Sequence, residues 1–190
     1  MTDNINNIKS TGARALADLS IVLDNTQEAE VEAFIAAISN AKRVALHGLG
    51  REGLQMRGLA MRLFHLGIDA HVVGDMTTPP LGAGDLLIVS AGPGDFTTIE
   101  ALMNIAKAAG AKTAVVTAQA TGGAARRADV VLHIPAQTMA NDQAGKLSVL
   151  PMGSLFEVAM MLVFELFVLR LRDRIGETPE TMRARHTNLE

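Results

Sequence analysis

The sequence lacks three residue types altogether. It has no cysteine, tryptophan or tyrosine, and six phenylalanines are its only aromatic residues apart from histidine. Without cysteine the chain can form neither disulfides nor thiolate metal sites, which fits a reducing compartment, and we expect a cytoplasmic protein. The net charge of −3 provides no basic surface, and few rings are present for base stacking, so no nucleic-acid partner is expected.

A signal peptide and a membrane span are not expected either. The N-terminal stretch MTDNINNIKS has no basic region followed by an apolar run. The most apolar stretch is LFEVAMMLVFELFVLRLRDR from Leu155, and Glu157 and Glu165 interrupt it, which makes it a poor membrane span. A helix that is apolar on every face is typical of burial in a domain core or in a subunit interface.

The chain alternates short apolar runs with helical stretches. Five β-rich runs lie at 43–47, 69–73, 85–90, 112–117 and 129–134, and helical patterns fall between most of them, notably at 53–66 and 97–109. Continuously apolar runs indicate strands buried on both faces, and strand–helix alternation implies a parallel sheet. We therefore predict one α/β domain over residues 1–190. It consists of a five-stranded parallel sheet doubly wound by helices, with a helical N-terminal extension from Ile5 and a long C-terminal helix.

Two glycine-rich turns follow strands and lead directly into helices, namely HGLGREG at 47–53 and SAGPGDFTT at 90–98. In an open parallel sheet, ligands bind beyond the carboxyl ends of the strands. Glycines let backbone N–H groups approach an anion there, and the helix N-terminus adds about half a positive charge. The two turns therefore predict a ligand site. The alternative is that their glycines only permit tight packing between strand and helix.

The first turn also has the G-x-G-x-x-G spacing of a dinucleotide-binding turn, with Asp75 roughly where a ribose-binding acid would lie. That aspartate belongs to a turn, GDMTTPP, rather than to the end of a strand. The chain also lacks the second half of a six-stranded dinucleotide fold. A nucleotide-dependent oxidoreductase is therefore an alternative and not the main interpretation.

Several sequence blocks carry a family resemblance. They are GLGREG followed by AMRLFHLG, then VVGDMTTPPLGAGDLLI, IAKAAGAK, LPMGSLFE and the closing MRARHTNLE. On these blocks, which extend over essentially the full length, the chain resembles the sugar isomerase (SIS) domain family and, within it, the 6-phospho-3-hexuloisomerases. The resemblance implies a cofactor-free enzyme that isomerises keto-sugar phosphates through an enediol, binds a sugar or sugar phosphate, and forms a homotetramer.

The resemblance also implies that the two turns bind the substrate. The implied positions are Gly48, Gly50, Arg51, Glu52, Ala91, Gly92, Gly94, Asp95 and Thr98. Relatives usually place phosphate-binding hydroxyl groups at four positions that are here Glu52, Ala91, Pro93 and Phe96. Each hydrogen bond from a hydroxyl group to a phosphate contributes about 1.5–3 kcal/mol to binding, and this contribution is lost at these positions. The Glu52 carboxylate would in addition repel the phosphate. We therefore hypothesise an altered or relocated anion site. The alternative is an isomerase or a non-catalytic binding module for a different sugar, sugar acid or sugar phosphate.

Isomerisation through an enediol needs a base near the C–H bond and an acid near the carbonyl oxygen. Glu157 opens the apolar helix after PMGSL, where partial desolvation suits a base, and the resemblance places a catalytic glutamate in this motif. The alternative for Glu157 is an acid that only stabilises the helix dipole. Neither a metal nor another cofactor is expected, because there is no H-x-x-x-H pattern and no tight cluster of carboxylates.

Five histidines remain to be assigned. His186, in the closing block, is predicted to act in acid–base chemistry or substrate binding, folded over the site of a neighbouring subunit; the alternative is a terminal anchor. His47 ends the first strand, where it either reaches the pocket or belongs to the core. His65 is expected to be a charge near a helix end, whereas His71 and His133 are expected to pack within strands.

Overall fold

The structure of the chain, a computed structural model, describes residues 7–143 and 148–189, so Ile5 of the expected first helix lies outside the described residues. Five strands form one sheet in the order β2-β1-β3-β4-β5, and all neighbouring pairs are parallel. The strands are β1 (Val44–His47), β2 (Ala70–Val72), β3 (Leu86–Ser90), β4 (Lys112–Thr117) and β5 (Val130–His133). Each strand falls within the run predicted for it, and the predicted fold class is confirmed.

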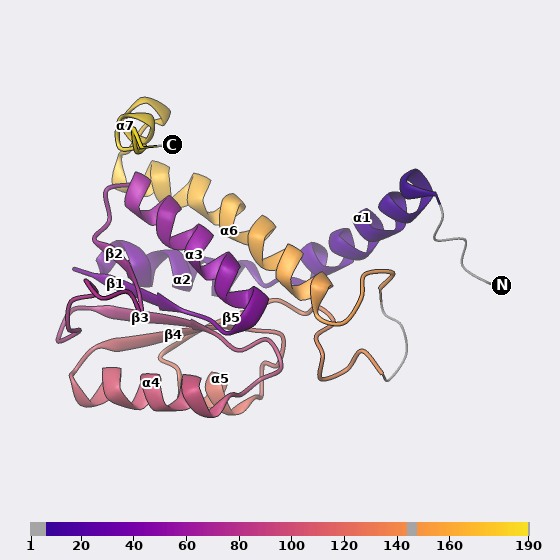
Figure 1. Ribbon diagram of the computed structural model, residues 1–190, viewed down its shortest axis with the longest axis horizontal. Coiled ribbons are helices and arrows are strands. Elements are labelled where there is room, and N and C mark those ends of the chain that lie inside the picture. Colours follow the sequence, from indigo (N-terminus) through magenta and orange to yellow (C-terminus); the bar gives the residue numbers. More distant parts are fainter. Residues whose placement is uncertain (1–6, 144–147, 190) are drawn as a thin grey trace.

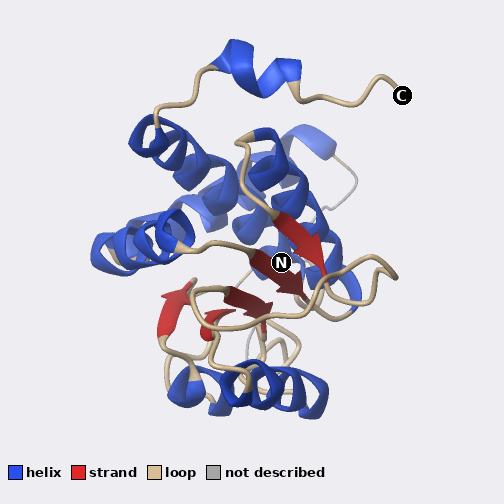
Figure 2. Cartoon of the chain, turned by 90° about the vertical axis from the view of Figure 1, so that its left-hand side faces the viewer, coloured by secondary structure: helices blue, strands red, loops and turns tan. Residues whose placement is uncertain are grey.

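Helices cover both faces of this sheet. They are α1 (Ile8–Asn25), α2 (Glu28–Asn40), α3 (Gly50–His65), α4 (Thr97–Ala108), α5 (Gly123–Arg127), α6 (Ser154–Ile175) and α7 (Pro179–Ala184). Figure 1 shows α4 and α5 below the sheet and α3 and α6 above it, and Figure 2 shows the same layers after a quarter turn. α7 lies beyond the upper layer, next to the C-terminus.

The sheet separates two hydrophobic cores. In β1, the side chains of Val44 and Leu46 belong to the core under α2, α3 and α6, whereas Ala45 belongs to the core over α4. The same alternation holds in β3, where Ile88 lies in the first core and Val89 in the second. Because both of its faces are buried, the central strand β3 is almost entirely apolar, and this is the pattern that made it predictable.

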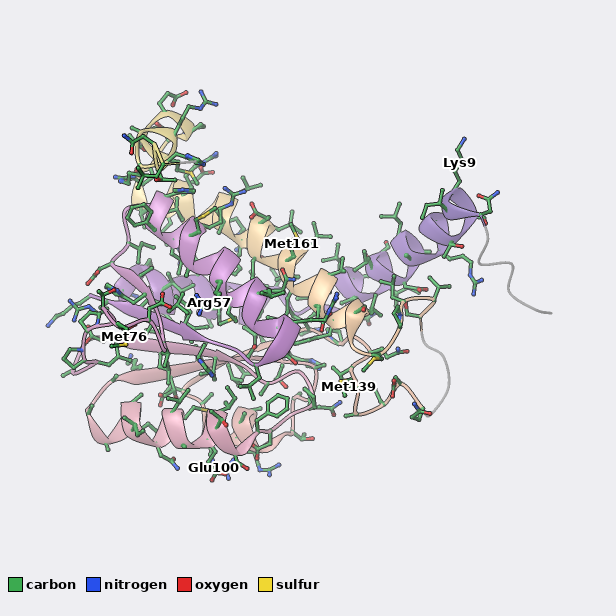
Figure 3. The ribbon with its side chains drawn as sticks, in the orientation of Figure 1. Lys9, Arg57, Met76, Glu100, Met139 and Met161 are labelled. Carbon is green, nitrogen blue, oxygen red and sulfur yellow. The ribbon has the colours of Figure 1, made fainter. Side chains whose placement is uncertain are left out.

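α6 is apolar on nearly all faces, but the single chain buries only its inner side. Phe156, Phe164 and Phe167 lie in the core beneath it. Four apolar side chains on its outer side stay exposed: Val158, Met161, Leu166 and Leu169. Met161 is one of this outer row (Figure 3). The expected burial on every side therefore does not hold for one chain, because no described element covers the outer row.

α3 begins at Gly50 rather than near residue 53, so Arg51 and Glu52 belong to its first turn. The glycines of this segment predicted a turn. Glu52 instead favours a helix start here, because a carboxylate in the first turn of a helix interacts favourably with the helix dipole. The helix therefore starts inside the predicted ligand-binding turn. In the part of the chain that the structure describes, no helix has the length and apolar character needed to cross a membrane.

Candidate active site

The two glycine turns meet the start of α6 at the carboxyl ends of β1 and β3, where they enclose a cavity of about 450 Å³. We call it the turn cavity. Its lining residues come from the first turn and α3, from the second turn, and from the segment that leads into α6: Leu49, Gly50, Arg51, Glu52, Pro93, Phe96, Thr138, Met139, Pro151, Met152, Gly153, Ser154, Phe156 and Glu157. The lining is mainly apolar, with its charged groups concentrated at Arg51, Glu52 and Glu157.

Close packing explains two glycines of the first turn, Gly48 and Gly53, since a Cβ atom at Gly53 would lie 2.5 Å from the Gly48 carbonyl oxygen. A Cβ atom at Gly48 would lie 2.5 Å from the Ser90 hydroxyl oxygen and 3.0 Å from the Gly53 Cα atom. Gly48 is therefore needed for the approach of β1, β3 and α3. Gly50 has open space around its Cα and lines the cavity, so packing does not account for it. The packing interpretation thus holds for Gly48 and Gly53, and Gly50 remains a predicted ligand-binding position.

Glu157 lies in the first turn of α6, where its carboxylate forms an ion pair with the Arg51 guanidinium from the first turn of α3. The Glu157 side chain is 13% exposed, whereas that of Arg51 is 67% exposed. A buried carboxylate with a single counter-charge and an open cavity in front of it has the surroundings that a general base needs. The structure therefore brings together two residues that are far apart in the sequence and that were both predicted for the site.

Glu52 points across to the second turn. Its Oε2 and Oε1 atoms lie 3.1 and 3.3 Å from the backbone nitrogen of Gly92, which donates a hydrogen bond to the carboxyl group. Burial raises the pKa of Glu52 above its ordinary value, and the negative charge of Glu157 raises it further. The Gly92 hydrogen bond and the nearby Ser90 hydroxyl oppose this shift of the pKa without cancelling it. Glu52 thus occupies the place where the two turns meet.

Neither of the two arginines that precede or follow Glu52 closely in the sequence, Arg51 and Arg57, forms an ion pair with it. Arg51 pairs instead with Glu157, and Arg57 lies 3.4 Å from the Asp75 carboxylate. The Ser90 hydroxyl oxygen, also close to Glu52, is buried and makes no hydrogen bond of normal geometry with a described residue.

The remaining predicted positions of the second turn lie outside the cavity lining. Ala91 is fully buried in the core over α4, and Gly94 is buried as well. Asp95 is exposed and lies 3.2 Å from the Arg127 guanidinium, and Thr98 is exposed in the first turn of α4. Their predicted role in binding the substrate stays a prediction.

His186 lies at the far end of α3 from this cavity. Its ring stacks on the ring of His65, with centroids 5.3 Å apart, and its Nδ1 atom lies 3.0 Å from the Thr187 carbonyl oxygen. A helix rises 1.5 Å per residue, so the fourteen steps from Arg51 to His65 separate the two ends of α3 by about 21 Å. Within one chain, His186 therefore does not reach Glu157, which leaves only a neighbouring subunit for the predicted role.

The other four histidines do not line the turn cavity. His65, expected to be a charge near a helix end, lies in the last turn of α3 and is buried, at 5% exposure. His71 lies 2.7 Å from Asp69, and His133 lies 3.3 Å from a backbone carbonyl oxygen. Burial lowers the pKa of His47, and its Nε2 atom is buried without a hydrogen-bond partner among the described residues.

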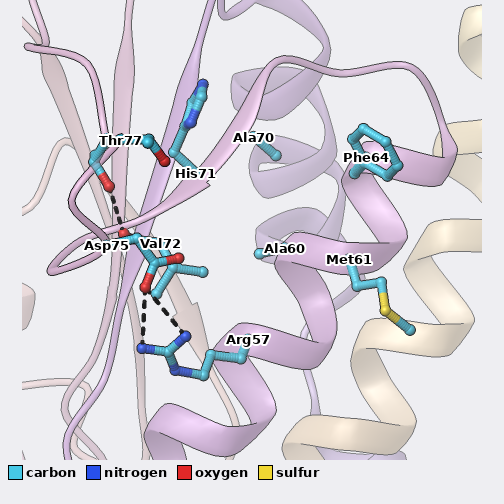
Figure 4. A pocket seen from close by; sticks show the side chains of 10 residues that line it. Arg57, Ala60, Met61, Phe64, Ala70, His71, Val72, Asp75 and Thr77 are labelled. Atoms are coloured by element: carbon cyan, nitrogen blue, oxygen red, sulfur yellow. Dashed lines mark hydrogen bonds and ion pairs between the residues drawn. The ribbon is translucent and has the colours of Figure 1, made fainter. Parts of the chain in front are cut away.

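A second pocket, of about 330 Å³, lies between α3 and β2 (Figure 4). Arg57 and Asp75 face each other across it, and Thr78 donates a hydrogen bond to the Val72 carbonyl oxygen at 2.6 Å. Asp75, the residue considered for a ribose hydroxyl, thus pairs with an arginine. This pocket includes neither Glu52 nor Glu157.

The sequence interpretation assigned no role to the segment before α6, although it forms one wall of the turn cavity. Thr138, Met139 and Met152 belong to this wall, and Met139 is labelled in Figure 3. Met152 has a left-handed backbone with φ of 53°, and its carbonyl oxygen accepts a hydrogen bond from Gln137 at 2.9 Å. Across residues 7–143 and 148–189, no three histidine, aspartate or glutamate side chains are grouped so that they could hold a metal.

The resemblance to sugar isomerases implied Arg51 and Glu157 as site positions, and both line the turn cavity. Residues 37–162 match the family model of the SIS domain. The chain belongs to the SIS domain family.

Similar proteins extend this finding over nearly the whole chain. The chain is 37% identical over 188 residues to the 3-hexulose-6-phosphate isomerase of Mycobacterium gastri, covering 99% of this chain and 92% of the relative. It is 36% identical over 175 residues to the enzyme of that name from Methylomonas aminofaciens, covering 92% and 96%. A crystal structure from Methanococcus jannaschii, described as inferring the same molecular function, aligns with a TM-score of 0.80 and 25% identity over 94% of this chain and 98% of that one. The chain has the sequence and fold of a sugar-phosphate isomerase, and the predicted resemblance is confirmed.

Proposed function

We propose that the protein isomerises a keto-sugar phosphate in the turn cavity by moving a proton between two adjacent carbons, with Glu157 as the base. The ion pair between Glu157 and Arg51 carries this proposal, because it gives a largely buried carboxylate its counter-charge beside a ligand-sized space. The relatives from M. gastri and M. aminofaciens are named 3-hexulose-6-phosphate isomerases, which favours a 3-ketohexose 6-phosphate as the substrate.

The reaction requires only residues of the chain and the sugar itself. Glu157 removes the proton from the carbon next to the carbonyl, an enediol forms, and Glu157 returns the proton to the neighbouring carbon. The mainly apolar walls, including Phe96 and Phe156, exclude water from the enediol. Neither a metal nor another cofactor is needed for this proton transfer.

Deuterium exchange tests the role of Glu157. In D2O, the parent protein is expected to introduce deuterium into fructose 6-phosphate at the carbon next to the carbonyl, and Glu157→Gln is expected to lower this rate by about 10²–10⁴-fold. Glu165→Gln is the matched control, because Glu165 lies on the same helix and pairs with Arg62 at 2.8 Å, outside the turn cavity. Exchange by Glu157→Gln at the parental rate would refute the assignment.

The position of Glu52 favours a second candidate. Its carboxyl group occupies the junction of the two turns and already accepts the Gly92 N–H bond. The ligand end that docks there would then be uncharged, as in a sugar without a phosphate at that end, or its phosphate would bind elsewhere. An isomerase or a non-catalytic binding module for such a sugar is the alternative function.

Self-association is part of the main proposal. Exposed apolar side chains lie on α3 and α6, among them Phe64 at 52% and Met161 at 57% exposure, and their burial against other copies would stabilise a homotetramer. In such an assembly, His186 of one copy would contact the substrate of another. Light scattering tests this, and Met161→Asp is expected to lower the molar mass. The cytoplasm remains our expected location, on the basis of the cysteine-free sequence.

A further inference from the structure

Two carboxyl groups line the turn cavity, and only one of them has a positively charged partner among the described residues. Glu157 pairs with the Arg51 guanidinium. Glu52 accepts a hydrogen bond from the uncharged Gly92 amide, and no arginine or lysine of the described residues forms an ion pair with it. Two carboxylates in one small cavity disfavour each other's ionisation, so the cation beside Glu157 decides which of the two carries the negative charge.

The pKa of Glu52 agrees with this geometry. Burial raises it, and the charge on Glu157 adds to the increase. A neutral carboxyl group can keep its carbonyl oxygen on the Gly92 N–H and still present its O–H to a ligand. Glu52 then offers a proton in the cavity in which Glu157 offers a free electron pair.

The other polar side chains of the lining are unsuited to supply that proton. Arg51 does not lose its proton in proteins, and the hydroxyl groups of Thr138 and Ser154 titrate far above neutral pH. His186, the residue considered from the sequence, lies at the opposite end of α3 in the same chain. Glu52 is therefore the one other carboxyl group of the described lining besides Glu157, and it lies where it can give its proton to a ligand.

We propose that Glu52 is the general acid of the isomerisation, which donates its proton to the carbonyl oxygen of the sugar while Glu157 removes the proton from the adjacent carbon. This inference rests on the proposed isomerase function and adds a second catalytic residue to it. It also gives the glutamate a chemical purpose at a position where the resemblance led us to expect a phosphate-binding serine.

Protons and electrons balance over the full reaction cycle with these two residues alone. Glu157 takes the C–H proton, the C–H electron pair becomes the C=C bond of the enediol, and the carbonyl π pair takes the proton of Glu52. In the second half, the Glu52 carboxylate takes the proton of the other enediol hydroxyl as the new carbonyl forms. The C=C pair then takes the proton back from Glu157. Both glutamates end in their starting states.

The test is the pH dependence of deuterium exchange into fructose 6-phosphate for the parent, Glu52→Gln, Glu52→Asp and Glu165→Gln. The parental rate is expected to fall on the alkaline side, as the acid loses its proton. Glu52→Gln is expected to be slower by about 10²–10⁴-fold and to lose this alkaline limb, because an amide accepts the Gly92 bond but donates no proton. Glu52→Asp is expected to keep the limb at a reduced rate, and Glu165→Gln to match the parent.

A substrate-free measurement accompanies the kinetics. In protein with 13C-labelled glutamate side chains, a carboxyl signal that disappears in Glu52→Gln is expected to titrate above the ordinary glutamate range. A Glu52 signal that is fully ionised throughout the active pH range would overturn the proposal.

The outcomes distinguish a failure of the acid assignment from a failure of the isomerase function. If Glu157→Gln is inactive while Glu52→Gln keeps the parental rate and profile, the acid assignment is overturned and the base assignment stands. If the parent itself exchanges no deuterium into fructose 6-phosphate or fructose, the isomerase function fails, and the acid role of Glu52 fails with it.

Discussion

The imidazole ring of His186 stacks on the buried ring of His65, with ring centroids 5.3 Å apart and an angle of 23° between their planes. Next to it, the Arg185 guanidinium donates a hydrogen bond to the His65 carbonyl oxygen at 3.0 Å and pairs with Glu177 at 2.7 Å. The closing segment of the chain is therefore anchored on the C-terminal end of α3. The terminal-anchor alternative and the predicted role in a neighbouring subunit are compatible, because an anchored residue can still face another copy.

The anchoring of this segment should depend on acidity. Hydrogen bonds from Arg185 and Thr181 lower the pKa of Glu177 from its ordinary 4.5 to about 2. A carboxylate with a depressed pKa in the folded state adds stability above the ordinary pKa, and this contribution is lost as the pH falls through the folded value. Glu177→Gln should therefore melt below the parent near neutral pH, and the difference in Tm should shrink as the pH falls from 4.5 to about 2. A difference that is constant with pH would contradict this interpretation.

Removing the Arg51 side chain should lower kcat/KM strongly, although this side chain is largely exposed. Arg51→Met leaves the largely buried Glu157 carboxylate without a counter-charge. Hydrogen bonds to charged groups contribute about 1.5–3 kcal/mol, so kcat/KM should fall by about 10–100-fold. Arg62→Met is the matched control, because Arg62 lies on the same helix and pairs with a glutamate outside the turn cavity. Equal losses in the two variants would point to a general effect of removing α3–α6 ion pairs.

Replacing Glu52 by serine should change the preference for phosphorylated ligands. The substitution removes the carboxyl group from the junction of the turns and frees the Gly92 N–H group, which that carboxyl group now occupies. Calorimetry should find that Glu52→Ser binds fructose 6-phosphate about tenfold or more tightly than the parent, given about 1.5–3 kcal/mol for a charge-assisted hydrogen bond. Binding is measured here and not turnover. An unchanged affinity would show that the phosphate docks away from this junction.

Glu52 should also make the stability of the protein depend on pH. Because burial raises its pKa in the folded state, the folded protein binds the proton more tightly than the unfolded chain does. The contribution of Glu52 to stability is then fully present below its ordinary pKa of 4.5 and is lost as the pH rises through the higher folded value. Glu52→Gln should remove this decline, so its stability relative to the parent should increase with pH. Urea unfolding followed by circular dichroism at several pH values measures this, with Glu165→Gln as the control.

The contact between the two turns leaves no room for a larger residue at position 92. A Cβ atom there would lie 2.6 Å from the Glu52 carboxyl oxygen and 2.7 Å from the Phe156 ring. Gly92→Ala should destabilise the protein by about 1–3 kcal/mol and reduce activity. Gly58→Ala is the control, since a Cβ atom at Gly58 meets no other atom within 4 Å. It should stabilise α3 by about 0.5–1 kcal/mol and leave activity unchanged.

The sheet was predictable because its strands are rich in apolar residues, a pattern that the local sequence displays directly. The start of α3 was not predictable, because glycine is typical of turns and only the tertiary structure shows that the helix begins at Gly50. The partner of Glu52 was missed for a related reason. A backbone N–H group has no signature in the sequence, so nothing indicated that Gly92, forty residues away, would bind this carboxyl group. The burial of His65 likewise results from the docking of the C-terminal segment.

Because Glu157 lies in the first turn of α6, its position should be lost only when the whole molecule unfolds. The following turns of this helix bury Met160, Phe164 and Phe167 in the larger core, so Glu157 cannot change its direction without disturbing that core. Heat inactivation should therefore coincide with the loss of helical ellipticity instead of preceding it. The working temperature of such an enzyme is set by the packing of its interior, and improving that packing raises the temperature limit without altering the cavity.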